Sequence, residues 1–145
     1  MANIPSKILI TIGRILLALY FFVPGLAKLL APASQLEMMQ HHGLPYALPL
    51  LYIAGITQTI GAVLLATNRY VRLTSLGFVL YILLINVTMH DFWNFTGIEA
   101  AHELQNHIKN LGILAGVLVL AGISPRRKLS LKGFLYSDDK VKTVT

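Results

Sequence analysis

The chain has 145 residues, of which 55% are hydrophobic and 12% charged, and it carries a formal net charge of +6. A soluble domain carries about 25% charged residues, and a mean hydropathy of +0.66 is too high for one. These values exclude an ordinary soluble enzyme and favour an integral membrane protein. The sequence contains no cysteine, which excludes thiol–disulfide exchange and iron–sulfur clusters held by thiolates.

Four apolar segments are long enough to cross a bilayer, which requires about 20 mostly apolar residues. They cover residues 8–30, 48–67, 73–89 and 108–123, and the last two need flanking residues to reach that length. No linker or repeat divides the chain, so residues 1–145 are predicted to form a single domain. We therefore expect an all-α fold, an integral membrane four-helix bundle.

The basic residues lie on one side of the predicted membrane. They concentrate at the start of the chain, in the connection at residues 68–72 and in the tail at residues 124–145, whereas the two longer connections hold most acids and histidines. The positive-inside rule places the basic regions in the cytoplasm, so both termini are predicted to be cytoplasmic. This topology accounts for the net charge, and nucleic acid is not an expected partner.

Two cations interrupt the first apolar segment. Arg14 and Lys28 are fourteen residues apart, close to four turns at about 3.6 residues per turn, so they share one helical face. Lys28 lies near the outer edge and either extends to the lipid head groups or pairs with acids of the third connection. Arg14 lies deeper, and we expect an internal partner for it, namely Gln58, Asn86 or a backbone carbonyl.

A primary amide, that of Gln58, lies near the middle of the second segment. Without a partner at this depth it would cost about 1 to 3 kcal/mol. It therefore forms either a hydrogen bond between helices or a contact with a ligand. Gln58 shares a stripe with Gly55, Thr59 and Ala62, and small residues at this spacing allow two helices to approach closely.

The most polar part of the chain is residues 90–116, with three of the six acids and three of the five histidines. Ionisable side chains at the edge of a membrane usually face a partner or a cavity, so we expect any function to lie here. Glu103, Asn106 and Asn110 recur at helical spacing, which predicts that the last helix begins near Gly97, before the membrane.

Two features of this block have alternative interpretations. Trp93 and the adjacent phenylalanines either belong to the aromatic belt at the membrane surface or roof a pocket. Glu99, Glu103 and His107 have a spacing that suits a metal ion, but such residues more often form ordinary exposed pairs. We do not predict a metal site.

Several motifs occur together in the chain: Gly13-Arg14, Gly25-Leu26-Ala27-Lys28-Leu29, Gly43-Leu44-Pro45, Arg69, His90-Asp91-Phe92-Trp93, Glu103-Leu104-Gln105-Asn106 and Ile108-Lys109-Asn110-Leu111. In these motifs the chain resembles the DoxX family of small bacterial membrane proteins almost from end to end. The resemblance implies a four-helix bundle in the bacterial cytoplasmic (inner) membrane. Relatives include membrane subunits linked to thiosulfate oxidation that deliver electrons to quinone, and proteins that join other redox or oxidative-stress assemblies. Many relatives have a glutamate where this chain has Gln58.

We therefore expect an accessory subunit of a quinone-linked or oxidative-stress redox complex rather than a self-sufficient enzyme. Its polar site would lie near the outer leaflet and comprise Arg14, Lys28, Gln58, His90, Asp91, Trp93, Glu103, Asn106, Lys109 and Asn110. A quinone, held without a covalent bond, is the expected cofactor, because its carbonyls need hydrogen-bond donors beside an apolar wall. The sequence assigns no catalytic residue.

Expected partners are the lipid bilayer, a membrane or periplasmic redox protein and, through the small residues Gly55 and Gly112, a second copy of the chain. Two other functions stay open. A carrier of a small solute or lipid would use a route from Lys28 through Gln58 to Arg14, and it needs a cavity that opens to both sides. A scaffold would instead pair Asp91 with Lys28, and Glu103 with Lys109, and bind no ligand.

Overall fold

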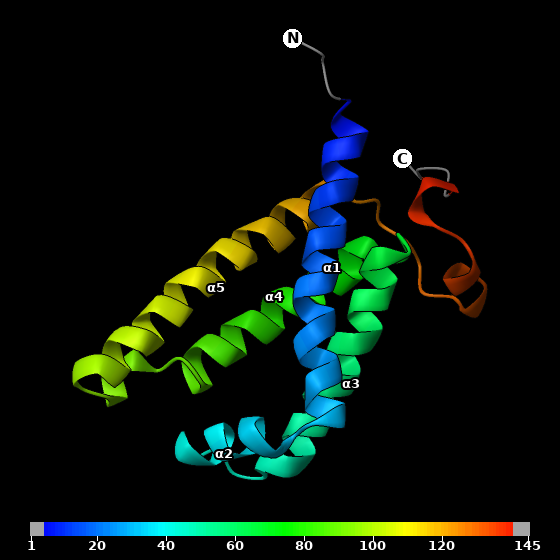
Figure 1. Cartoon of the computed structure of the whole chain (residues 1–145). Coiled ribbons are helices and arrows are strands. Elements are labelled where there is room, and N and C mark those ends of the chain that lie inside the picture. Colours follow the sequence, from blue (N-terminus) through cyan, green and yellow to red (C-terminus); the bar gives the residue numbers. More distant parts are fainter. Residues whose placement is uncertain (1–4, 141–145) are drawn as a thin grey trace.

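The structure, a computed structural model, describes residues 5–140. Residues 141–145 of the predicted tail, including Lys142, lie outside this part. Every regular element within it is a helix (Figure 1). The α-helices are α1 (Ser6–Leu30), α2 (Ala33–His41), α3 (Ala47–Ala66), α4 (Val71–Thr88) and α5 (Gly97–Ile123), and the short 3-10 helices are η1 (Phe92–Asn94), η2 (Leu131–Leu135) and η3 (Asp138–Lys140).

The predicted all-α fold with four long apolar helices is confirmed. Four segments are long and apolar enough to cross a membrane: Ser6–Leu30, Ala47–Ala66, Val71–Asn94 and Gly97–Ile123. The last helix begins at Gly97, as its polar stripe predicts. Leucine, isoleucine and valine side chains cover the outward faces of these helices, which suits contact with lipid. The placement of both termini in the cytoplasm stays a prediction.

The four long helices form two pairs. α1 packs along α3, α4 packs along α5, and the two pairs contact each other less extensively. Figure 1 shows them diverging from the α3–α4 turn toward α2 and η1. We name the end that holds α2, η1 and the start of α5 the outer end. The end that holds the α3–α4 turn and residues 124–140 is named the inner end. The names follow the predicted orientation.

Close contact between α1 and α3 depends on two glycines. A Cβ atom added to Gly25 would lie 2.8 Å from Gln58 Cβ, and one added to Gly55 would lie 2.8 Å from Leu29 Cδ2 and 3.0 Å from Lys28 Cβ. The predicted role of the stripe at Gly55 is thus confirmed. Gly112 has no such neighbour within 4 Å among the described residues.

The apolar core lies where the two pairs meet. The rings of Phe21 and Phe78 stack with their centroids 3.7 Å apart and an interplanar angle of 4°. Gly61 makes room for this stack, since a Cβ atom there would lie 2.7 Å from Phe78 Cζ. Leu65 and Val117 are fully buried beside it. This packing fixes the α1–α3 pair against the α4–α5 pair.

The tail folds onto the α3–α4 turn, which the sequence did not reveal. Asp138 accepts hydrogen bonds from the backbone N–H groups of Tyr70 (3.1 Å) and Val71 (3.0 Å), which begin α4. The first N–H groups of a helix have no partner within it, so a carboxylate is a favourable acceptor there. Arg127 Nη1 lies 2.6 Å from Asp138 Oδ1, and its guanidinium lies 4.5 Å from the centre of the Tyr70 ring.

Arg14 belongs to the inner end as well. Its Nη1 group donates hydrogen bonds to the backbone carbonyls of Leu65 and, at 2.9 Å, Ala66. These carbonyls end α3, where no intrahelical donor remains and a cation is favourable. Of the partners predicted for Arg14, the backbone carbonyl is therefore the one that the fold supplies.

Candidate functional site

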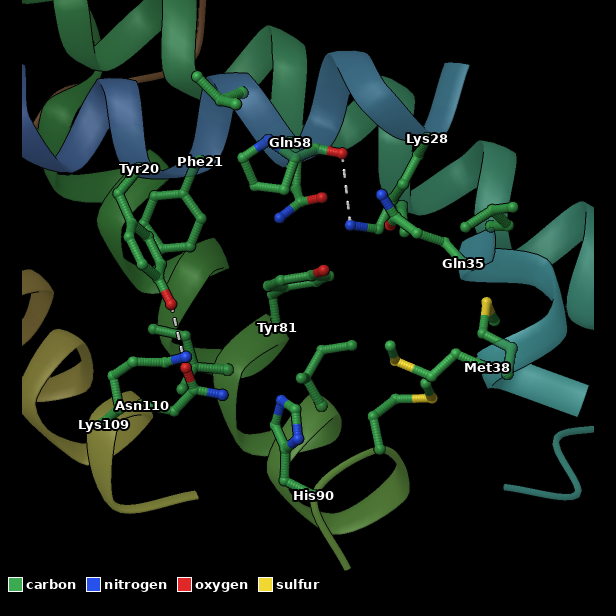
Figure 2. A pocket seen from close by; sticks show the side chains of 18 of the residues that line it. Tyr20, Phe21, Lys28, Gln35, Met38, Gln58, Tyr81, His90, Lys109 and Asn110 are labelled. Carbon is green, nitrogen blue, oxygen red and sulfur yellow. Dashed lines mark hydrogen bonds between the residues drawn. The ribbon is translucent and has the colours of Figure 1, made fainter. Parts of the chain in front are cut away.

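A cavity of about 680 Å³ lies between the two helix pairs, toward the outer end. Its wall is mainly apolar and includes Leu51 and Ile85. Met38 also lines it (Figure 2). Ligand pockets in proteins usually measure about 300 to 1,000 Å³ and combine an apolar wall with a few polar groups. The volume is therefore sufficient for an aromatic head group.

Two residues form what we call the α1–α3 polar group, Lys28 and Gln58. The close approach at Gly25 and Gly55 directs both side chains into the cavity, where Figure 2 shows them beside each other. Lys28 Nζ has one hydrogen bond, a long one of 3.5 Å to the Pro24 carbonyl. Gln58 is 3% exposed, and its Oε1 atom is buried without a partner among the described residues. Both side chains thus retain hydrogen-bonding capacity.

Three residues form the α4–α5 polar group, His90, Lys109 and Asn110. Asn110 is held in place by a chain of hydrogen bonds: the Tyr20 hydroxyl donates to its Oδ1 (3.1 Å), and its Nδ2 donates to Asn86 Oδ1 (2.8 Å). The chain links α1, α5 and α4. Tyr81 projects between this group and the α1–α3 polar group (Figure 2).

His90 is joined to a carboxylate behind the cavity wall. Its Nδ1 atom lies 2.7 Å from Glu103 Oε2, and the other oxygen of Glu103 lies 3.5 Å from Nδ1 of His102, whose side chain is 67% exposed. One turn further along α5, Lys109 Nζ donates to Asn106 Oδ1 at 2.9 Å. Glu103 and Asn106 therefore position residues of the α4–α5 polar group.

The helix α2 covers the outer side of the cavity with Met38 and Met39. Two histidines at its end bind carboxylates of the third connection. His42 Nδ1 lies 2.8 Å from Asp91 Oδ1 in a buried pair, and the more exposed His41 Nε2 lies 2.7 Å from Glu99 Oε1. The His41–Glu99 pair holds α2 against the start of α5, and the His42–Asp91 pair holds it against the residue before η1.

The predicted site residues fall into three sets. Lys28, Gln58, His90, Lys109 and Asn110 line one cavity, while Glu103 and Asn106 support it from behind. The other three, Arg14, Asp91 and Trp93, do not line it.

The structure selects among the alternatives that the sequence left open. Trp93 is 54% exposed and packs against Phe92 and His107 rather than roofing the cavity. Within residues 5–140 Lys28 forms no ion pair with an acid; Asp91 binds His42 and Glu103 binds His90 instead.

Several residues that line the cavity or support it were not predicted from the sequence. Tyr20 and Tyr81 lie inside apolar segments, where tyrosine carries no distinct signal. Met38 and Met39 belong to α2, which we expected only as a connection. His42 could have been noticed, since two adjacent histidines are uncommon in so apolar a chain, but its partner Asp91 is 49 residues away.

Glu99, Glu103 and His107 do not converge on a metal site. Their side chains have separate partners, respectively His41, His90 and the His90 backbone carbonyl. Residues 5–140 contain no group of three or more histidine or acidic side chains arranged to hold a metal ion.

Comparison with known proteins agrees with the fold. The DoxX family matches residues 9–91, more than half of the chain. The inner membrane protein YphA of Escherichia coli (strain K12) is 27% identical over 118 residues, which cover 81% of this chain and 84% of YphA. No solved structure matches the chain. With its four spanning segments and this relative, the chain is a multi-pass protein of the bacterial inner membrane. It belongs to the DoxX family.

Proposed function

We propose that the chain binds a quinone in the cavity and serves as an accessory subunit of a membrane redox complex. The observation that supports this proposal best is the α1–α3 polar group, in which Lys28 and Gln58 retain hydrogen-bonding capacity inside an apolar cavity. A buried amide without a partner costs about 1 to 3 kcal/mol. Only a group that donates a hydrogen bond to Gln58 Oε1 would remove this cost, whereas Lys28 Nζ can donate to a ring oxygen of a quinone.

The cavity wall suits a flat aromatic head with an apolar tail. Met38, Met39 and Met89 are flexible and polarisable, so they can pack against a ring. Lysine, tyrosine and asparagine side chains offer donors to ring oxygens, and the cavity lies among membrane-spanning helices, where a lipophilic molecule is available. A quinone combines these features.

The composition supports a role as an accessory subunit. The chain contains no cysteine and so cannot supply thiolates to a redox cluster. Electrons that reach a bound quinone would therefore come from a partner. We propose a membrane or periplasmic redox protein as this partner, in contact with the outer end.

The geometry favours this proposal over a carrier. A carrier would need a polar route from Lys28 through Gln58 to Arg14. The cavity contains Lys28 and Gln58, but Arg14 lies at the inner end, where its guanidinium is bonded to the end of α3. Arg14 lines a different groove of about 750 Å³ between α1 and α5, and Tyr20 is the one lining residue that this groove shares with the cavity. The packed Phe21–Phe78 core lies between the two helix pairs.

Binding can be measured on the protein reconstituted in lipid nanodiscs, with a short-chain ubiquinone analogue as the probe. We expect Lys28→Met to weaken quinone binding by about tenfold, since one hydrogen bond from a charged donor is worth about 1.5 kcal/mol or more. Lys7→Met is the matched control, because Lys7 is exposed on the same helix. Equal affinity in the wild type and Lys28→Met would place the quinone elsewhere, and no binding in the wild type would refute the proposal.

The proposed partner can be tested in the native membrane. The tagged chain is purified in mild detergent, and its co-purifying proteins are identified for the wild type and for a Lys109→Met, Asp91→Asn variant. We expect a redox protein with the wild type and its loss in the variant. Recovery of the bare bundle in both cases would favour a scaffold or an isolated binding protein.

A further inference from the structure

The α4–α5 polar group presents a hydrogen-bond acceptor to the cavity. Nδ1 of His90 faces the Glu103 carboxylate at 2.7 Å, so in the neutral imidazole the proton resides on Nδ1. Nε2 then carries a lone pair. Nε2 has no hydrogen bond among the described residues, and Figure 2 shows the ring of His90 directed into the cavity.

The α1–α3 polar group presents a second acceptor. Gln58 Oε1 is a carbonyl oxygen, and an amide oxygen can only accept hydrogen bonds. It is buried without a donor, although Gln58 is directed into the cavity from the opposite helix pair. The cavity therefore has an unused acceptor on each of two sides.

We infer that the cavity prefers the reduced, dihydroxy form of a quinone, a quinol, over the oxidised form; this inference rests on the proposed quinone-binding function. A quinol has a hydroxyl donor at each end of its ring, and each can be directed at one of the two acceptors. A quinone carries only acceptors, so it leaves Gln58 Oε1 and His90 Nε2 unpaired, which is unfavourable above all for the buried Gln58 Oε1.

Donors in the cavity do not reverse this preference. The oxygens of a quinone and of a quinol both carry lone pairs, so the donors Lys28, Tyr81 and Lys109 can bond either form. The quinone therefore still binds, more weakly. The charged or titratable side chains around His90 are Glu103, His102 and His107 behind it, Asp91 next to it in the chain, Lys109 in the same polar group, and Lys28 across the cavity.

A preference for the quinol changes the redox equilibrium of the bound molecule. Tighter binding of the reduced form raises the midpoint potential of the bound couple above that of the free couple. For a two-electron couple the rise is about 30 mV for each tenfold difference in affinity. The site would thus draw electrons onto its quinone, in agreement with a subunit that receives electrons from a partner.

The test compares both redox forms of one short-chain ubiquinone analogue under anaerobic conditions, on the wild-type protein in nanodiscs. We expect the quinol to bind at least about tenfold more tightly than the quinone, because two additional hydrogen bonds are formed. A redox titration of the bound couple should independently give a midpoint potential about 30 mV or more above the free couple. Neither measurement depends on the folding of a variant.

Two substitutions test whether Gln58 and His90 cause the preference for the quinol. Gln58→Leu and His90→Phe should each weaken quinol binding by about tenfold and weaken quinone binding less, so that the preference for the quinol decreases. Gln58→Glu, which keeps an acceptor, should retain the preference, and Thr57→Val, at an exposed position on the same helix, is the control. Equal binding of both forms by the wild type overturns the inference and leaves the proposed function intact. Binding of neither form refutes both.

Discussion

Different basic side chains form the polar contacts at the two ends of the bundle. At the inner end, Arg127 binds Asp138 and Arg14 binds the carbonyls that end α3. At the outer end, histidines take the place of the arginines, as in the pairs His42–Asp91 and His90–Glu103. An arginine is always charged, whereas a histidine gains and loses its charge near neutral pH.

The contacts that stabilise the fold and the groups that can bind a ligand therefore lie at opposite ends of the bundle. At the inner end Asp138 binds Arg127 and the start of α4, and the apolar core is packed beside these groups, while Arg69 Nε and Ser75 Oγ are buried without a partner among the described residues. The outer end surrounds a cavity in which Gln58 Oε1 is left without a partner. We conclude that the inner end anchors the two helix pairs and that the outer end is free to adapt to a ligand.

Removal of Asp138 should have the largest effect on stability. Asp138→Ala leaves the buried Arg127 without its counter-ion and two N–H groups of α4 without an acceptor, and we expect a loss of about 3 kcal/mol. Thermal unfolding in detergent measures this loss, and trypsin should cleave the released tail near Arg126. Lys132→Ala, at an exposed position of the same tail, is the control. A tail that stays protected with unchanged stability would contradict the role of the inner end as an anchor.

A methyl group at Gly25 should disturb both ends through the α1–α3 contact. Gly25→Ala places Cβ 2.8 Å from Gln58 Cβ and 3.1 Å from the backbone of Thr59, so the helices must separate, at a cost of about 2 kcal/mol. Ligand affinity should fall with stability because Gln58 moves. Gly13→Ala has nothing within 4 Å of the added Cβ and should be neutral or slightly stabilising. Equal unfolding curves for Gly25→Ala and Gly13→Ala would show that α1 and α3 are not closely packed at Gly25.

At the outer end, loss of a histidine pair should loosen α2 without unfolding the bundle. Asp91→Ala removes the partner of His42, whose side chain is only 2% exposed, and we expect a local cost of about 1.5 kcal/mol. Hydrogen–deuterium exchange of the α2 amides should become faster, while exchange in α3 stays slow. Glu99→Gln breaks only the exposed pair with His41 and should have little effect. Faster exchange throughout the protein would mean that the outer end also carries global stability.

Much of the fold follows from the sequence, because length and hydropathy determine a membrane span directly. The helix of residues 97–123 was also predictable, since its polar residues repeat at helical spacing well before the apolar part begins. The helix α2 was not, as Ala33–His41 has no apolar periodicity. The folded tail depends on the contact between Asp138 and Arg127 with the α3–α4 turn, and such long-range pairing leaves no local pattern.

The candidate site was predictable in its residue types and less so in its pairing. An ionisable or amide side chain within a span requires a partner, and this rule led to Lys28, Gln58 and Asn110. It did not indicate which carboxylate each basic residue binds, because this depends on how the two helix pairs diverge. Asp91 lies beside His42 rather than Lys28 for this reason.

Two tyrosines of the cavity differ in whether their hydroxyl groups are hydrogen-bonded, and their substitution should have the smallest effect on stability. The Tyr20 hydroxyl donates to Asn110 Oδ1 at 3.1 Å, whereas the Tyr81 hydroxyl has no hydrogen bond among the described residues. Tyr20→Phe should therefore lower the free energy of unfolding by about 1 kcal/mol, and Tyr81→Phe should leave it unchanged but weaken quinone binding. Both are measured on the same samples by thermal unfolding and by quinone titration. If Tyr81→Phe lost stability and kept its affinity, Tyr81 would belong to the framework of the bundle, because a hydroxyl that stabilises the empty protein cannot be reserved for a ligand.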